Sequence, residues 1–211
     1  MEINNSLYKA TTIVGIKING QTALAGDGQV TFGQSYVQKK TANKIRKLYN
    51  NTVIVGFAGG VADAFALLDK FEGMLQKFSG NLLRSCIELA NLWRTDKTFR
   101  RLEAMMIAAN KDNMYILSGM GDVIEPEYNI AAIGSGGAFA LSAARALAAN
   151  TTLTAAEVAT KSLEIAADLC IYTNNNIVLE VLDAAAPKTP PTTEKPKEAK
   201  KPAPKTTKAK K

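Results

Sequence analysis

The sequence KATTIVGI, at positions 9–16, joins a short polar leader to a pair of threonines that opens an apolar run. If the chain is cut between Ala10 and Thr11, Thr11 carries a hydroxyl nucleophile and a free α-amine on the same residue. An α-amine has a reference pKa of ~7.7–8.0, so it can act as a general base near neutral pH. Taken alone, Thr-Thr-Ile-Val is more typical of an ordinary β-branched strand. The rest of the chain decides between the two interpretations.

Length and composition favour one globular domain. The chain has 211 residues, of which 46% are apolar, and no apolar run reaches the length of a membrane span. Residues 1–10 lack the apolar core of a secretory signal. Cys86 and Cys170 lie far apart and form no CxxC pair, which favours buried, reduced thiols over a disulfide. We therefore expect a cytoplasmic protein.

The basic charge of the chain is concentrated at its C-terminal end. The formal net charge is +7, and residues 187–211 alone carry nine Lys against two Glu, so the remainder is formally neutral. The Pro/Lys/Thr/Ala composition predicts a disordered tail over residues 186–211. A neutral body argues against nucleic acid as the main partner. A weak contact between the tail and an anionic partner is the alternative.

Two absences narrow the possible chemistry. The chain contains no His, which excludes Ser-His-Asp catalysis, Cys-His catalysis and His-ligated zinc within this chain. It also contains no GxxxxGK[ST] loop, so we do not expect it to bind ATP. A hydrolase with this composition needs a nucleophile that is activated in another way.

Hydrophobic periodicity predicts an α+β fold. Antiparallel hairpins, the first closed by a type I′ turn at Asn19-Gly20, favour two packed sheets with helices on their outer faces. Residues 31–41 are polar and predict a loop or a short extended segment. The predicted strands are 12–18, 21–25, 44–49, 52–58, 102–109, 114–117, 122–124, 129–133 and 177–182, and the predicted helices are 61–78, 82–95, 138–149 and 155–169.

Three turns carry candidate functional groups. Gly59-Gly60 ends an apolar strand and begins a helix, so its free N–H groups could bind a developing oxyanion. Asp27 ends a strand between two glycines, and Ser135 lies in the turn Gly134–Gly137. Ordinary turn formation is the alternative for each of them.

Seven motifs in order make the chain similar to a known family. They are TTIV at 11–14, AGDGQ at 25–29, GFAGG at 56–60, ADAF at 62–65, WRTD at 93–96, IGSGG at 133–137 and CIYTN at 170–174. On these residues the chain resembles the HslV (ClpQ) family, the bacterial proteasome-like peptidases of the N-terminal-nucleophile superfamily. The resemblance extends from Thr11 to about Leu182.

The resemblance implies a fold, an activity and partners. It implies a four-layer αββα sandwich and a threonine endopeptidase domain at residues 11–185, exposed when residues 1–10 are removed by autolysis. It also implies a homo-dodecamer of two stacked hexameric rings. The implied partner is the ATPase HslU (ClpY), which hydrolyses ATP and delivers unfolded proteins.

The resemblance also assigns roles to individual residues. Thr11 matches the nucleophile, and Asp27 and Lys44 match the supporting acid and lysine. The following strand at 45–49 selects Lys44 over Lys39 or Lys40. The N–H of Gly59 would bind the oxyanion.

Further residues follow from the same resemblance. Ser135 would orient the Thr11 amine or a bridging water. A monovalent cation, sodium, would bind the backbone carbonyls of Ala167, Cys170 and Thr173.

Two rival functions stay open. The chain could be a catalytically silent ring subunit that keeps its leader, or an N-terminal-nucleophile amidohydrolase that acts on small amides without an unfoldase.

Overall fold

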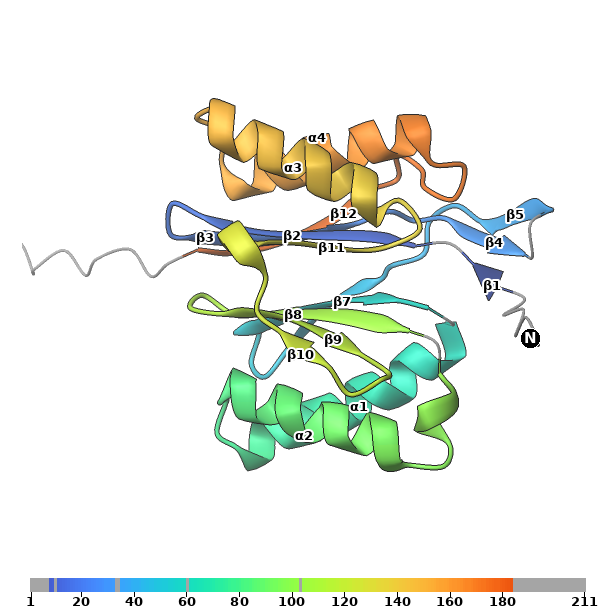
Figure 1. Cartoon of the computed structure of the whole chain (residues 1–211), viewed down its shortest axis with the longest axis vertical. Helices are drawn as coiled ribbons and strands as arrows, with labels where there is room; N and C mark the ends of the chain where they lie inside the picture. Colours follow the sequence, from blue (N-terminus) through green and yellow to red (C-terminus); the bar gives the residue numbers. More distant parts are fainter. Residues whose placement is uncertain (1–7, 10, 33–34, 60, 103, 184–211) are drawn as a thin grey trace, which may run out of the picture.

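Two β-sheets lie face to face, and a pair of helices covers the outer face of each (Figure 1). This computed structural model describes residues 8–9, 11–32, 35–59, 61–102 and 104–183. The arrangement confirms the predicted four-layer αββα sandwich. The predicted tail at 186–211 and most of the predicted leader lie outside the described residues.

One half of the sandwich contains a four-stranded antiparallel sheet in the order β11-β2-β3-β12, covered by α3 and α4. Its elements are β2 (Thr12–Ile18), β3 (Gln21–Gly26), β11 (Ile130–Gly134), β12 (Val178–Asp183), α3 (Gly137–Asn150) and α4 (Ala155–Leu169). The short 3-10 helix η2 (Glu127–Asn129) leads into β11.

The other half contains a five-stranded antiparallel sheet in the order β10-β9-β8-β7-β6, covered by α1 and α2. Its elements are β6 (Ile45–Leu48), β7 (Val53–Ala58), β8 (Met105–Ala109), β9 (Met114–Ser118), β10 (Val123–Ile124), α1 (Val61–Lys77) and α2 (Leu82–Thr95). A second 3-10 helix, η1 (Phe99–Arg101), follows α2.

Local signals in the sequence place several element ends correctly. Asn19 and Gly20 both have positive φ, 52° and 75°, which the type I′ turn between β2 and β3 requires. The Thr154 side chain caps α4 by accepting a hydrogen bond from the Glu157 N–H, and the Glu157 carboxylate accepts one from the Thr154 N–H.

The apolar run in the opening stretch forms a strand that is buried on both faces. Ile13 packs in the core between the two sheets, whereas Val14 and Ile16 pack in the core beneath α3 and α4. All three are fully buried. A strand covered on both faces needs a continuous apolar run rather than alternation. Trp93 is fully buried in the third core, between α2 and the other sheet.

The polar segment at 31–41 is extended, which is one of the two forms predicted for it. It forms a hairpin of β4 (Val30–Phe32) and β5 (Tyr36–Lys39), and leader strand β1 (Tyr8–Lys9) pairs antiparallel with β4. Tyr8 lies opposite Phe32 in this three-stranded sheet. Because every residue of β5 is exposed, its side chains carry no apolar alternation from which a strand could be predicted.

Several strand ends meet at one end of the sandwich. Thr12, the first residue of β2, lies opposite Gly134, the last residue of β11. Its neighbour Ile13 lies opposite Gly26, the last residue of β3. The residues just beyond these strands, Thr11, Asp27 and Ser135, are thereby brought together.

Close packing of the two sheets depends on a glycine in β7. A Cβ on Gly56 would lie 2.5 Å from Ile13 Cγ2 and 3.0 Å from Ile45 Cδ1. We expect Gly56→Ala to lower the free energy of unfolding by about 1–3 kcal/mol through overpacking, as measured by urea denaturation.

Gly73 provides the matched control. It is exposed in α1, and a Cβ there would meet none of the described heavy atoms within 4 Å. Gly73→Ala should raise the free energy of unfolding by about 0.5–1 kcal/mol. Similar effects of the two substitutions would contradict close packing at Gly56.

Candidate active site

Thr11 is held through its backbone at the start of β2. It is 5% exposed, and its carbonyl oxygen accepts a hydrogen bond of 2.9 Å from the Ser135 N–H. A Cβ on Gly134 would lie 1.9 Å from the same oxygen, and the φ of Gly134 is +89°. The Gly134-Ser135 turn thus fixes the position of Thr11, and only glycine fits at its first residue.

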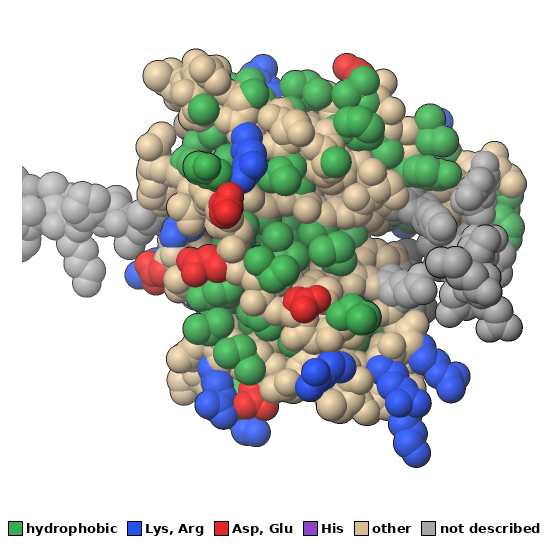
Figure 2. Space-filling model, viewed as in Figure 1, with side chains coloured by type: hydrophobic (Ala, Val, Ile, Leu, Met, Phe, Trp, Pro, Cys, Tyr) green, Lys and Arg blue, Asp and Glu red, His purple; other side chains and the backbone are tan. Residues whose placement is uncertain are grey.

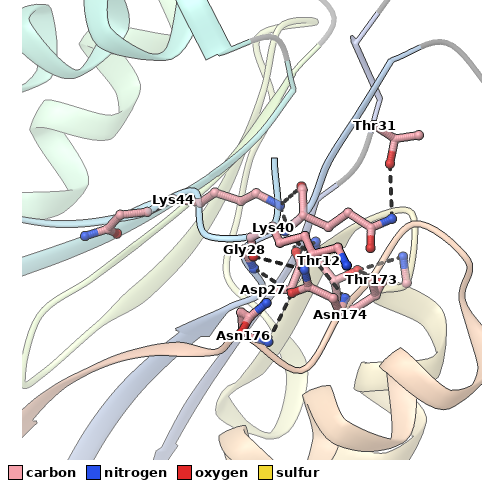
Figure 3. A network of polar contacts seen from close by, with 12 residues as sticks. Thr12, Asp27, Gly28, Thr31, Lys40, Lys44, Thr173, Asn174 and Asn176 are labelled. Carbon is pink, nitrogen blue, oxygen red and sulfur yellow. Dashed lines mark hydrogen bonds and ion pairs between the residues drawn. The ribbon is translucent and has the colours of Figure 1, made fainter. Parts of the chain in front are cut away.

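Asp27 and Lys44 form a buried ion pair. Lys44 Nζ lies 2.8 Å from Asp27 Oδ1 and donates a second hydrogen bond of 2.6 Å to the Gln29 carbonyl (Figure 3). The Lys44 side chain is 8% exposed, and the Asp27 side chain is fully buried. Burial lowers the pKa of Lys44 from its ordinary value, and Asp27 opposes this shift only in part.

Asp27 collects several further hydrogen bonds. Its Oδ1 accepts the Thr12 N–H at 2.8 Å, and its Oδ2 accepts the Gln29 N–H at 2.9 Å and the Asn174 N–H at 3.4 Å. The bond to Gln29, two residues on, is the turn-forming contact expected of an Asp beside glycine. Asp27 therefore forms the turn and also binds the lysine, and the two interpretations of this residue are compatible.

A second buried contact joins the start of β2 to the segment after α4. Thr12 Oγ1 lies 2.7 Å from Thr173 Oγ1 and accepts a hydrogen bond of 2.9 Å from the Gly136 N–H. Both threonines are 5% exposed or less. This contact ties the IGSGG turn, β2 and the CIYTN segment into one unit.

The other predicted residues lie around this unit. Gly59 follows β7 and is half-buried. A Cβ on Gly134 would lie 3.4 Å from the Cβ of Ala58, the residue before Gly59. The turn is thus close to Thr11, as an oxyanion donor must be. Ser135 is exposed, and its N–H contacts Thr11. Gly60 lies outside the described residues.

The three residues predicted to bind a cation lie along one short segment. Ala167 is in the last turn of α4, Cys170 caps that helix, and the Thr173 N–H donates to the Cys170 carbonyl at 3.0 Å. Within the described part of the chain, no cluster of three or more His, Cys, Asp or Glu side chains could hold a metal ion. A cation here would depend on carbonyl oxygens.

Sequence reasoning missed three contributions to the site. These are the Thr12 hydroxyl, the Gln29 carbonyl and the side chain of Asn174, which bonds to Gly28 and Lys40. All three residues lie within the seven motifs, but a motif does not indicate which distant segment each of its residues contacts.

Comparison with known proteins identifies the family. The family model described as proteasome subunit matches residues 7–182. The ATP-dependent protease subunit HslV of Caldicellulosiruptor saccharolyticus is 59% identical over 176 residues, 83% of this chain and 100% of that protein. The chain belongs to the HslV family. The HslV subunit of Staphylococcus epidermidis is 55% identical over 181 residues, 85% of this chain and 100% of that protein.

Solved structures agree with this assignment. The crystal structure of eukaryotic HslV from Trypanosoma brucei has a TM-score of 0.78 at 41% identity, and the match covers 82% of this chain and 99% of that one. Thiobacillus denitrificans BPH, solved in complex with epoxomicin, has a TM-score of 0.66 at 19% identity over 83% of this chain and 100% of that one, and so shares the fold alone. No helix of the described residues is long and apolar enough to cross a membrane.

The two threonine hydroxyls should be energetically coupled. We expect Thr12→Val and Thr173→Val each to lower the free energy of unfolding by about 1–3 kcal/mol, because each leaves a buried polar partner unsatisfied. The loss of unfolding free energy in the double variant should be smaller than the sum of the two single losses, by about 0.5 kcal/mol or more. Urea denaturation of all four proteins measures this coupling.

Thr95→Val is the control, since Thr95 is exposed on α2 and its hydroxyl bonds only within that helix among the described contacts. It should change the free energy of unfolding by less than about 0.5 kcal/mol. Strict additivity of Thr12→Val and Thr173→Val would show that the two hydroxyls do not depend on each other.

Proposed function

We propose that this chain is the proteolytic subunit of a two-component ATP-dependent protease and a threonine endopeptidase whose nucleophile is Thr11. The observation that carries the proposal is the buried Lys44–Asp27 pair, which contacts the N–H of Thr12, the residue next to Thr11. The chain has no His, so another group must activate the Thr11 hydroxyl, and the pair provides a positive charge for this purpose. Both HslV relatives are named as ATP-dependent protease subunits, which supports the proposal.

The chemistry begins once residues 1–10 have been removed. The Thr11 α-amine accepts the hydroxyl proton, and Thr11 Oγ1 attacks the substrate carbonyl to form a tetrahedral oxyanion. The Gly59 N–H stabilises that oxyanion. The peptide bond then breaks, and the leaving amine takes the proton. Water hydrolyses the resulting ester and restores Thr11.

Lys44 and Ser135 assist the amine and the hydroxyl. The Lys44 ammonium, held by Asp27, favours the unprotonated form of the Thr11 amine through like-charge repulsion and favours loss of the hydroxyl proton. Ser135 orients the amine or a bridging water. Support for this role comes from the Ser135 N–H, which already contacts Thr11.

Removal of the leader uses the same nucleophile. Thr11 Oγ1 attacks the Ala10 carbonyl, the acyl group moves from nitrogen to oxygen, and water cleaves the ester to free the Thr11 amine. Pairing of β1 with β4 supports this step, because it guides the leader toward Thr11 as an extended strand.

Membership of the HslV family supports the proposed assembly. Because the chain lacks a GxxxxGK[ST] loop, ATP is hydrolysed by a partner, the HslU (ClpY) ATPase, which delivers unfolded proteins to a dodecamer of two stacked hexameric rings. Exposed apolar side chains, many of them visible in Figure 2, suit such subunit contacts; among the described residues the most exposed are Met120, Tyr128, Leu169 and Ile171. We place the protein in the cytoplasm, which its two free, buried cysteines support.

Sodium is the proposed cofactor. Ala167 and Cys170 lie at the C-terminal end of α4, where carbonyls carry partial negative charge and favour a cation. The hydrogen bond from Thr173 to Cys170 brings the third carbonyl into the same turn. The residues therefore fit a cation held by backbone oxygens, which would support the segment that contacts Asp27.

Processing tests the nucleophile. We expect wild-type protein to lose residues 1–10 and Thr11→Ala to keep them, as measured by intact mass. Hydrolysis of a fluorogenic peptide with HslU present should fall by at least about 10³-fold in Thr11→Ala, because the hydroxyl is lost. Thr11→Ser, which keeps both the hydroxyl and the amine, should still be processed.

Three outcomes would overturn parts of this proposal. Leader loss in Thr11→Ala would assign the cleavage to another protease. Retention of the leader in wild-type protein would favour the silent ring subunit. Protein degradation that is not stimulated by HslU would favour the amidohydrolase.

Sodium should stabilise the folded protein. We expect the Tm of sodium-free protein to rise with added NaCl, because a ligand that binds only the folded state stabilises it. Choline chloride at the same ionic strength is the control. Equal Tm values in the two salts would contradict a specific sodium site.

A further inference from the structure

The side chain of Asn174 links three separate segments around the ion pair. Its Oδ1 accepts hydrogen bonds from the Gly28 N–H at 3.2 Å and the Asn176 N–H at 3.1 Å. Its Nδ2 donates to the Lys40 carbonyl at 3.0 Å (Figure 3). Because N–H groups lie on one side and a carbonyl on the other, these partners define the orientation of the amide.

The linked segments are those that carry the ion pair. Gly28 directly follows Asp27, and Lys40 begins the stretch that leads to Lys44. The two stretches are also joined by a hydrogen bond of 2.8 Å from the Ala42 N–H to the Gly28 carbonyl.

Packing at this junction leaves no spare room. A Cβ on Gly28 would lie 2.3 Å from the Lys40 carbonyl oxygen and 3.1 Å from the Asn176 carbonyl oxygen. The backbones of the three segments therefore meet at Gly28, and Asn174 bridges them from the side.

We propose that Asn174 is a positioning residue. By hydrogen-bonding to both Lys40 and Gly28, it fixes the position from which the Lys44 side chain extends to Asp27. The proposal rests on the proposed function, in which the Lys44 ammonium assists Thr11. Asn174 makes none of the described side-chain contacts with Thr11 or with the Lys44 ammonium, so its effect is transmitted through the backbone.

The length of the lysine side chain makes this support necessary. Lys44 has a flexible four-carbon stem, and holding its ammonium in one place costs conformational entropy. Residues 41–43 are half-buried or exposed, so apolar packing does little to fix the stretch between Lys40 and Lys44. The hydrogen bonds at Gly28 and Lys40 do so instead.

Loss of this support should change the protonation of Lys44. Burial lowers the pKa of Lys44, and the Asp27 carboxylate in contact with it opposes this shift in part. If the stretch before Lys44 moves outward, water reaches the ammonium and its pKa rises toward the ordinary value. Activity that needs the ammonium is lost as pH rises through that pKa, so the alkaline limb of the pH–rate profile should shift to higher pH.

The experiment compares Asn174→Ala with wild type and with Asn175→Ala, an exposed neighbour in the same turn. Peptide hydrolysis with HslU is measured across pH on processed protein. We expect Asn174→Ala to lower kcat about 10-fold with little change in KM and to move the alkaline limb upward, because a catalytic charge is misplaced while substrate contacts remain. Asn175→Ala should match wild type.

A second variant isolates the donor contact. Asn174→Asp keeps an acceptor for the Gly28 and Asn176 N–H groups but loses the donor to the Lys40 carbonyl, so kcat should again fall. Wild-type kcat in Asn174→Asp would overturn the tie to Lys40. A lowered Tm in Asn174→Ala with unchanged kcat and alkaline limb would assign Asn174 a purely structural role.

Failure of this inference can be told apart from failure of the proposed function. If wild-type protein is unprocessed or inactive with HslU, the proposed function fails. If wild-type protein is active and Asn174→Ala has the same pH–rate profile, only the role of Asn174 fails.

Discussion

The buried contact between the Lys44 ammonium and the Asp27 carboxylate is the interaction on which the rest of the site depends. Removing two charges from water costs several kcal/mol per ion, and their attraction offsets that cost only where their other polar atoms are hydrogen-bonded. Asp27 meets this condition by accepting N–H groups from Thr12, Gln29 and Asn174. One carboxylate thereby fixes β2, the turn after β3, the stretch before β6 and the segment after α4 relative to one another.

Burial of this pair also suits a chain without His. A hydroxyl nucleophile needs a base that is largely unprotonated near neutral pH, and in the proposed mechanism the α-amine of processed Thr11 is that base. A nearby ammonium favours that unprotonated form, and its effect is stronger away from water, where charges are screened less. The low exposure of Lys44 lowers its own pKa, and in the proposed mechanism it would also strengthen the effect of the ammonium on Thr11.

The sequence predicted those features that depend on local physics or on a family motif. The Asn19-Gly20 turn follows from local backbone chemistry. The family resemblance, aligned on the strand at 45–49, selected Lys44, which the structure places beside Asp27. For residues 31–41 a short extended segment was one of two predicted forms, but the pairing of β4 with β5 was not predicted, because β5 is exposed throughout and has no apolar pattern. The contact between Thr12 and Thr173 was missed because the two residues are 161 positions apart, and only the packed fold brings them together.

The peptide unit between Thr173 and Asn174 connects the proposed cation site to this ion pair. Its N–H donates to Asp27 Oδ2 at 3.4 Å, the longest of the described contacts to that carboxylate, while its carbonyl belongs to the proposed sodium ligands. A peptide whose oxygen binds a cation is a stronger donor, because linked polar contacts polarise one another. This hydrogen bond from the Asn174 N–H to Asp27 Oδ2 is also the one that can shorten most. A cation at the proposed site would therefore influence Asp27, and through it Lys44, by way of this peptide and without direct contact with either side chain.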